Sequence, residues 1–239
     1  MHYPLSDLAD FAFILIFFVM PALFSSTSGN VTVPNAADIP WLTVIVYTAL
    51  TAYMAIRYSH SDKEIRFYRP EGRNSRFSRI FLFFNNSIVN IVTPFFCLLL
   101  SNFIVSRMAS VSGGADALPS IRVTAETTAD RLFLVFWTAL LAAFEEFTYR
   151  WLIPSRLLSL WAERRPKDEY TITRKVLCEL GAVCLFALSH RYMGWWAVLN
   201  AFIAGVILRT NFFVSGSVYP ALIAHILYNL TAFYGILKP

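Results

Sequence analysis

The chain has 239 residues, of which 57% are hydrophobic and only 15% are charged, with a formal net charge of +5. Soluble domains average roughly 45–50% apolar and about 25% charged residues, so this composition excludes an ordinary soluble enzyme and indicates a membrane protein. A basic balance can indicate nucleic-acid binding. Here the basic residues are concentrated in two loops between apolar stretches, so we expect the lipid bilayer, and no nucleic acid, to be the partner of this charge.

Apolar stretches of about 20 residues, the length that crosses the hydrocarbon core, recur along the chain. They predict an all-α fold, a polytopic transmembrane helical bundle of about seven spans, within a range of six to eight. The first stretch lacks the positive start of a cleaved signal, so we interpret it as a retained span. The predicted spans cover residues 8–24, 40–58, 80–105, 131–153, 176–190, 195–208 and 218–237.

The loops between these spans differ in charge. Residues 59–79 and 154–175 each contain six Lys or Arg, whereas residues 25–39 contain none and residues 106–130 contain two. The positive-inside rule places the two basic loops in the cytoplasm. With seven spans, the N-terminus is then cytoplasmic, and the short loops favour a bacterial inner membrane.

The fourth predicted span contains Glu145, Glu146 and Arg150 within an otherwise apolar stretch. An ionised group at mid-bilayer costs roughly 2.5–3.5 kcal/mol on insertion scales, so such residues usually line a cavity or a proton path. Glu146 and Arg150 are four residues apart, which places them on one helix face as an ion pair. Glu145 points about 100° away around the helix and is left available as a general base. The alternative interpretation is a buried ion pair that only fixes helix packing.

Two histidines lie in later apolar helices, His190 and His225, and Asn229 follows His225 by one turn. His225 and Asn229 share a helix face and can offer two donors to a developing oxyanion. Acid, base and amide groups in separate apolar helices indicate an active site that uses water inside the membrane. A three-ligand metal site of Glu145, His190 and His225 is an open alternative.

Three segments, in order along the chain, resemble the motifs of one known family. Residues 145–150 (Glu-Glu-Phe-Thr-Tyr-Arg) resemble its Glu-Glu-x-x-x-Arg motif, and residues 186–190 (Phe-Ala-Leu-Ser-His) resemble its Phe-x-x-x-His motif. Residues 225–229 (His-Ile-Leu-Tyr-Asn) are similar to its closing His-x-x-x-Asn motif. This is the CAAX prenyl endopeptidase and bacteriocin-processing (CPBP, Abi) family of glutamate-dependent intramembrane proteases. The resemblance suggests motif-free membrane spans over residues 1–129 and a catalytic core over residues 130–239 of the same membrane domain.

The resemblance implies a metal-independent intramembrane endopeptidase without a cofactor. Its substrate would be a membrane-associated protein or peptide, processed at a C-terminal or leader segment. In the family, the first glutamate and the histidine of the second motif activate a water, and the last histidine and asparagine stabilise the oxyanion. These catalytic roles fall on Glu145, His190, His225 and Asn229. Glu146 and Arg150 take supporting roles.

Two alternatives to a protease remain open. One is a non-catalytic membrane protein that binds a peptide or confers immunity on the same fold, and the other is a different enzyme, for acyl transfer or metal-dependent hydrolysis.

The chain also departs from the family pattern at Trp151, where a small residue is common, and at Arg209, where a glycine is common. Both changes add bulk near the expected cavity. A straight fifth span would in addition place His190 at the opposite side of the membrane from Glu145.

Overall fold

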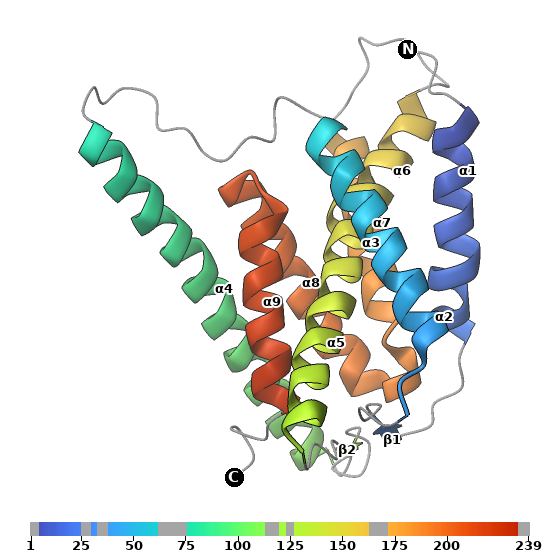
Figure 1. Cartoon of the computed structure of the whole chain (residues 1–239), viewed down its shortest axis with the longest axis vertical. Coiled ribbons are helices and arrows are strands. Elements are labelled where there is room, and N and C mark those ends of the chain that lie inside the picture. Colours follow the sequence, from blue (N-terminus) through green and yellow to red (C-terminus); the bar gives the residue numbers. More distant parts are fainter. Residues whose placement is uncertain are drawn as a thin grey trace.

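The computed structural model describes residues 5–24, 30–32, 38–61, 76–112, 120–122, 127–162 and 172–233. These residues form a helical bundle (Figure 1), and each predicted span falls on a helical segment, although residues 234–237 of the last one lie outside the described part. The helical segments are α1 (Leu5–Ile14), η1 (Leu15–Val19), α2 (Met20–Phe24), α3 (Trp41–Ser61), α4 (Arg76–Val111), α5 (Thr128–Glu146), η3 (Phe147–Leu152), α6 (Ile153–Ala162), α7 (Ile172–Leu188), η5 (Arg191–Met193), α8 (Trp195–Ser215) and α9 (Val218–Phe233).

Two three-residue strands accompany the helices. β1 (Asn30–Thr32) pairs in parallel with β2 (Ser120–Arg122). The sequence analysis did not predict them, because three residues are too few for an alternating apolar pattern. The strands connect the chain between α2 and α3 with the chain between α4 and α5, and they lie at the lower end of the bundle in Figure 1.

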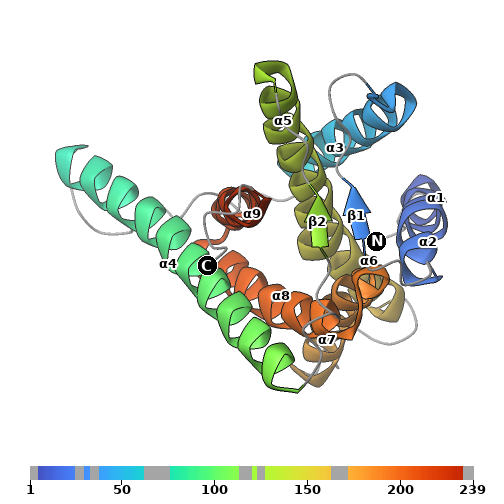
Figure 2. The same ribbon diagram turned by 90° about the horizontal axis from the view of Figure 1, so that it is seen from below.

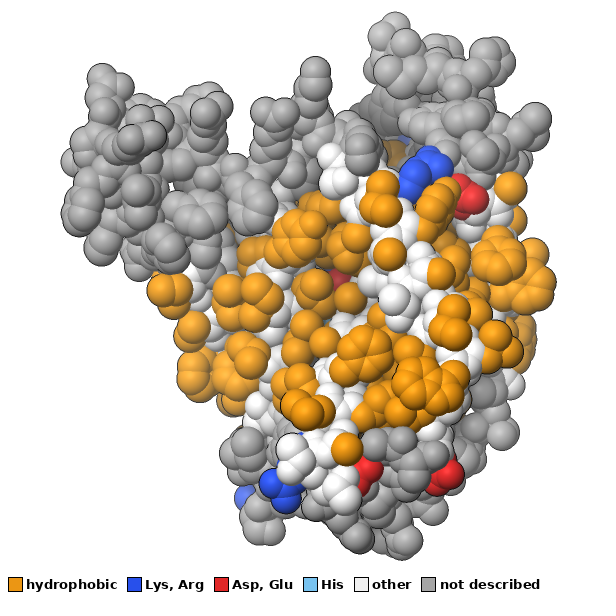
Figure 3. All heavy atoms as spheres, viewed as in Figure 1, with side chains coloured by type: hydrophobic (Ala, Val, Ile, Leu, Met, Phe, Trp, Pro, Cys, Tyr) orange, Lys and Arg blue, Asp and Glu red, His pale blue; other side chains and the backbone are white. Residues whose placement is uncertain are grey.

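The outer surface of the bundle is apolar. Three helical stretches, Ile88–Val111, Thr128–Leu158 and Trp195–Ser215, are long and apolar enough to cross a bilayer, and Ala9–Phe24 and Val218–Ala232 are shorter apolar helices. Figure 3 shows hydrophobic side chains over the middle of one face, with most of its charged side chains toward the two ends. Helices with internally satisfied backbone and lipid-facing apolar side chains are what a bilayer requires. The chain is an integral membrane protein.

One long helical rod carries the acidic motif through the bundle. It consists of α5, the π-helical turn η3 and α6 without interruption. A capping box starts it: the Thr127 side chain accepts from the backbone N–H of Asp130, and the Asp130 side chain accepts from the N–H of Thr127. Such reciprocal bonds satisfy the free N–H groups of a helix start.

The rod packs against the helices that carry the other motifs. α5 contacts α3 and α9, while η3 contacts α3, α6, α7 and α9. Figure 2 shows α4 along one side, against α8, with α1 and α3 on the opposite side of the rod. The three motif segments therefore meet at η3.

Aromatic residues fill the core around this meeting point. Phe144, Phe186 and Trp151 are buried. The Phe144 ring lies 4.7 Å from that of Tyr47. Trp151, one of the two departures from the family pattern, packs with its ring 5.7 Å from that of Tyr58. The bulk of Trp151 is thus taken up by a partner on α3.

Candidate active site

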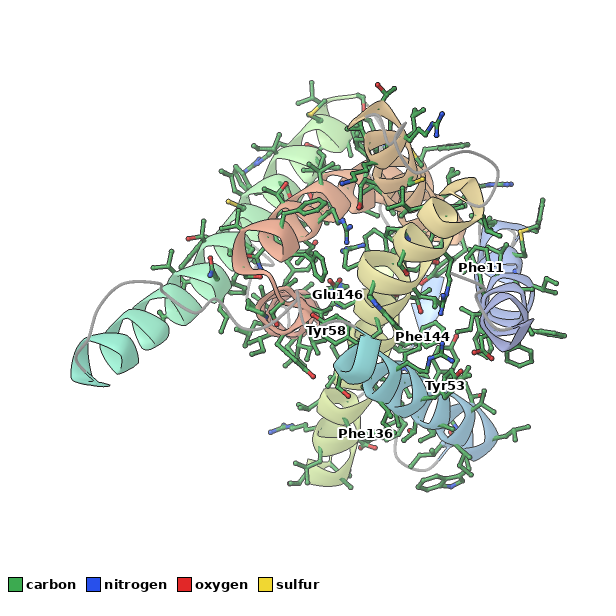
Figure 4. The ribbon with its side chains drawn as sticks, turned by 90° about the horizontal axis from the view of Figure 1, so that it is seen from above. Phe11, Tyr53, Tyr58, Phe136, Phe144 and Glu146 are labelled. Carbon is green, nitrogen blue, oxygen red and sulfur yellow. The ribbon has the colours of Figure 1, made fainter. Side chains whose placement is uncertain are left out.

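Glu146 and Arg150 form the ion pair that their spacing predicts. Nη2 of Arg150 lies 3.3 Å from Oε1 of Glu146, and neither side chain is exposed. Figure 4 places Glu146 in the centre of the bundle. A buried carboxylate is costly unless an opposite charge and hydrogen bonds compensate it. Arg150 supplies the charge, and its guanidinium is also supported by the Phe186 ring, whose centroid lies 4.3 Å from Cζ.

His225 of α9 is the second partner of Glu146. Its Nδ1 lies 2.9 Å from the same Oε1. A carboxylate held in an ion pair only accepts hydrogen bonds, so Nδ1 carries a proton and donates it. The sequence analysis did not predict this contact, since nothing local connects two residues that are 79 positions apart. The other ring nitrogen of His225, Nε2, takes no part in this bond.

Glu145 lies on the other side of the His225 ring. Its Oε2 is 3.7 Å from Nε2 of His225. The Glu145 side chain is 27% exposed, whereas that of Glu146 is fully buried. Two adjacent carboxylates therefore flank one imidazole, and of the two only Glu145 is open to a water molecule or a substrate.

Three tyrosines lie near the Glu145 carboxylate. Tyr47 of α3, Tyr149 of η3 and Tyr192 of η5 are close enough to interact electrostatically with it. In the turn between α7 and α8, burial and the charge of Glu145 raise the pKa of Tyr192 to about 12. Its hydroxyl is thus protonated at neutral pH and can donate a hydrogen bond. The sequence analysis missed these tyrosines, although Tyr192 follows His190 by two residues.

His190 lies in the turn that follows α7. Its Nδ1 is 2.9 Å from the carbonyl oxygen of Phe186. A carbonyl only accepts, so Nδ1–H donates and Nε2 of the neutral ring is left as an acceptor. The Phe186 ring centroid lies 4.8 Å from that of His190 and 6.3 Å from that of His225. Phe186 is therefore the shared neighbour of both histidines and Arg150.

Asn229 keeps its predicted place one turn beyond His225, because α9 is helical through both residues. Its side chain is half-buried. Of the predicted residues, the structure gives direct contacts among Glu145, Glu146, Arg150 and His225, and it connects His190 to them through Phe186. The oxyanion role of Asn229 stays a prediction.

The metal alternative can be compared with this geometry. Within the described ranges, no group of three or more His, Cys, Asp or Glu side chains is arranged to hold a metal ion. Glu145, His190 and His225 accordingly do not form a three-ligand site there. The described arrangement instead places the partly exposed Glu145 carboxylate 3.7 Å from Nε2 of His225, with the Phe186 ring next to both histidines.

Gly205 allows α8 to pack closely against α7, the helix that leads to His190. A Cβ at this position would lie 3.1 Å from Cγ1 of Val183 and 3.2 Å from Cδ1 of Phe186. We expect Gly205→Ala to lower the free energy of unfolding by about 1–3 kcal/mol, because both neighbours are buried and cannot move freely. Thermal unfolding in detergent measures this change.

Gly181→Ala is the matched control for that prediction. A Cβ at 181 would lie 3.7 Å from Cδ1 of Leu157, an ordinary contact. Alanine in a helix interior is favoured over glycine by roughly 0.5–1 kcal/mol, so this variant should melt no lower than the parent. A Gly205→Ala protein as stable as Gly181→Ala would show that α7 and α8 are not closely packed at Phe186.

Residues 127–231 match the family model described as Type II CAAX prenyl endopeptidase Rce1-like. The match runs from the N-cap of α5 into α9, so it contains all six site residues that the sequence analysis predicted. No curated protein and no solved structure matches the chain.

Proposed function

Because residues 127–231 belong to the CAAX prenyl endopeptidase family, we propose that this integral membrane protein is a glutamate-dependent, metal-independent endopeptidase. Its substrate is a membrane-associated protein or peptide, cut near a C-terminal or leader segment. One observation supports the proposal: two adjacent carboxylates flank His225, and one is buried in an ion pair while the other is partly exposed. That arrangement separates a structural acid from a working one.

The proposed reaction begins at Glu145. Its carboxylate takes a proton from a water molecule, which the Nε2 acceptor of His190 orients, and the water oxygen bonds to the carbonyl carbon of the peptide. Negative charge develops on the carbonyl oxygen. Donors placed for that charge contribute most of the rate enhancement in acyl transfer. The donors proposed here are Asn229 and, in the doubly protonated ring, Nε2–H of His225. The C–N bond then breaks as Glu145 returns its proton to the leaving amine.

Glu146 has a defined part in this scheme. It accepts the Nδ1–H of His225, so a second proton on Nε2 makes the ring a cation between two carboxylates. The cation is stabilised by Glu146 and donates strongly to the oxyanion. Arg150 keeps Glu146 ionised for this purpose.

The proposed setting is a bacterial inner membrane with the N-terminus in the cytoplasm. The helix ends next to both basic loops, the last turn of α3 and the adjoining ends of α6 and α7, lie at one end of the bundle in Figure 1. This shared end supports the orientation from the positive-inside rule. Reporter fusions placed after α3 and after α9 should give cytoplasmic and external signals respectively.

The reaction itself is tested with purified protein in liposomes and membrane-anchored test peptides. Hydrolysis in ¹⁸O-water should place one heavy oxygen on each new C-terminal carboxyl group, as measured by mass spectrometry. Activity should persist after treatment with a chelator. Loss with the chelator and recovery with zinc would favour the metal-dependent alternative, and binding of peptides without any cleavage would favour the peptide-binding one.

A further inference from the structure

Pro154 interrupts the hydrogen bonds of the motif rod just after the ion pair. In a regular helix the N–H of residue 154 would bond to the carbonyl of Arg150, but proline has no N–H and its ring crowds that carbonyl. The rod adopts the π-helical turn η3 immediately before this proline. π-Turns inside α-helices are rare and occur frequently at functional sites. The carbonyl of Arg150 has therefore lost its regular helical donor.

Arg209 of α8 supplies another donor to this carbonyl. Its Nη1 donates to the backbone oxygen of Arg150, and its Nη2 pairs with the Glu179 carboxylate of α7. Its guanidinium also lies 4.7 Å from the ring centroid of Phe212 and 4.5 Å from that of Phe213. A buried arginine is costly unless it is paired and hydrogen-bonded. The side chain thus connects α8 and α7 to the carbonyl that has no donor at residue 154.

A continuous set of contacts leads from this arginine to the acid open to substrate. Arg209 holds the backbone of Arg150, and Arg150 holds Glu146 at 3.3 Å. Glu146 accepts from Nδ1 of His225 at 2.9 Å, and Nε2 of His225 lies 3.7 Å from Glu145. A displacement of the Arg150 backbone would consequently reach the His225 ring through two short contacts.

We propose that Arg209, with Glu179 as its counter-ion, is a positioning residue that fixes the turn opened by Pro154 and thereby aligns Glu146 and His225. The expected fall in kcat of its variants rests on the proposed function. Arg209 stands where the family resemblance leads one to expect a glycine. The larger side chain of Arg209 fits here because it binds the Arg150 carbonyl, which has no donor at Pro154, and the Glu179 carboxylate.

A double-mutant cycle with Pro154 tests this proposal. Arg209→Leu removes the donor, and we expect kcat to fall about 100-fold with KM nearly unchanged, since misplacement of catalytic groups by about 1 Å costs that much. Pro154→Ala restores a backbone N–H four residues after Arg150. In that background, Arg209→Leu should cost less than about 10-fold, because residue 154 now supplies a bond to the carbonyl. Equal losses in both backgrounds would overturn the proposal.

Two further variants keep the test independent of folding failure. Arg209→Lys keeps a cationic donor and should retain most of the activity, whereas Arg107→Leu removes an exposed arginine of α4 and should change nothing. If Arg209→Leu does not fold, the melting temperatures of Arg209→Lys in the two backgrounds report the same coupling. The proposal would be overturned if Arg209→Lys had a kcat no higher than Arg209→Leu. It would also be overturned if the losses in melting temperature of Arg209→Lys and Pro154→Ala simply added in the double variant. Activity of Glu145→Gln at the parent rate would refute the proposed function alone and leave the melting-temperature cycle valid.

Discussion

Glu145→Gln should reduce peptide hydrolysis at least about 100-fold while leaving the protein folded. General acid–base catalysis by a positioned side chain contributes roughly 10²- to 10⁴-fold, and glutamine has the shape of glutamate without its basicity. Glu145 is 27% exposed, and its contact with His225, at 3.7 Å, is longer than a hydrogen bond. Its replacement therefore removes little structure. The measurement is kcat on a peptide that the parent cleaves, with thermal unfolding of the same preparation.

Glu146→Gln is the matched control, since it makes the same chemical change one residue further along the helix. Glu146 is fully buried, with Arg150 and His225 on one oxygen. Its neutralisation leaves Arg150 as an uncompensated buried charge, so this variant should lose stability as well as activity. Glu145→Gln should lose activity only. If Glu145→Gln retained the parent rate, Glu145 would not be the base. If both variants melted alike, the burial of Glu146 beside Arg150 would not contribute to stability.

The membrane spans were predictable from local periodicity. Apolar stretches of span length are visible without tertiary information, and every one falls on a helical segment. The pair of Glu146 and Arg150 was also predictable, because a spacing of four residues fixes a shared helix face. The structure contains that pair at 3.3 Å.

Contacts between helices were not predictable in the same way. The bond between His225 and Glu146 depends on how α9 rotates against the rod, and that rotation is set by packing over the whole interface. The position of His190 relative to Glu145 was not predictable either, because a straight fifth span would place the two residues at opposite sides of the membrane. His190 lies in the turn after α7, and the large Phe186 ring one turn earlier reaches both histidines and Arg150.

Arg209 shows an intermediate case. Its partners lie on other helices, so its contacts could not be derived from its own neighbourhood. Pro154, however, stands four residues after Arg150 in the sequence, and that spacing alone shows that the carbonyl of Arg150 lacks its usual α-helical donor. A buried arginine elsewhere in an apolar helix was a candidate for that bond. The missing N–H at Pro154 is thus visible in the sequence, whereas the bond from Arg209 depends on how α8 packs against the rod.

Arg150→Met should destabilise the protein by about 3–5 kcal/mol, the cost of leaving one member of a buried ion pair uncompensated. Glu146 and Arg150 are both fully buried, and within the described residues Oε2 of Glu146 has no hydrogen-bond partner that could take over. Unfolding by a denaturing detergent, followed by circular dichroism, measures the loss. The hydrogen bond from His225 would then remain to that carboxylate.

The double variant Arg150→Met with Glu146→Gln separates stability from catalysis. Replacing both members of a buried pair by neutral groups of similar volume is often neutral or stabilising, so most of the lost free energy of unfolding should return. Activity should not return, because a glutamine at position 146 can accept from Nδ1 of His225 but offers no charge to stabilise the imidazolium. A double variant that recovers both would show that the pair serves only to hold the helix together. Recovery of stability alone is the result expected if the ion pair exists to keep an ionised carboxylate against His225.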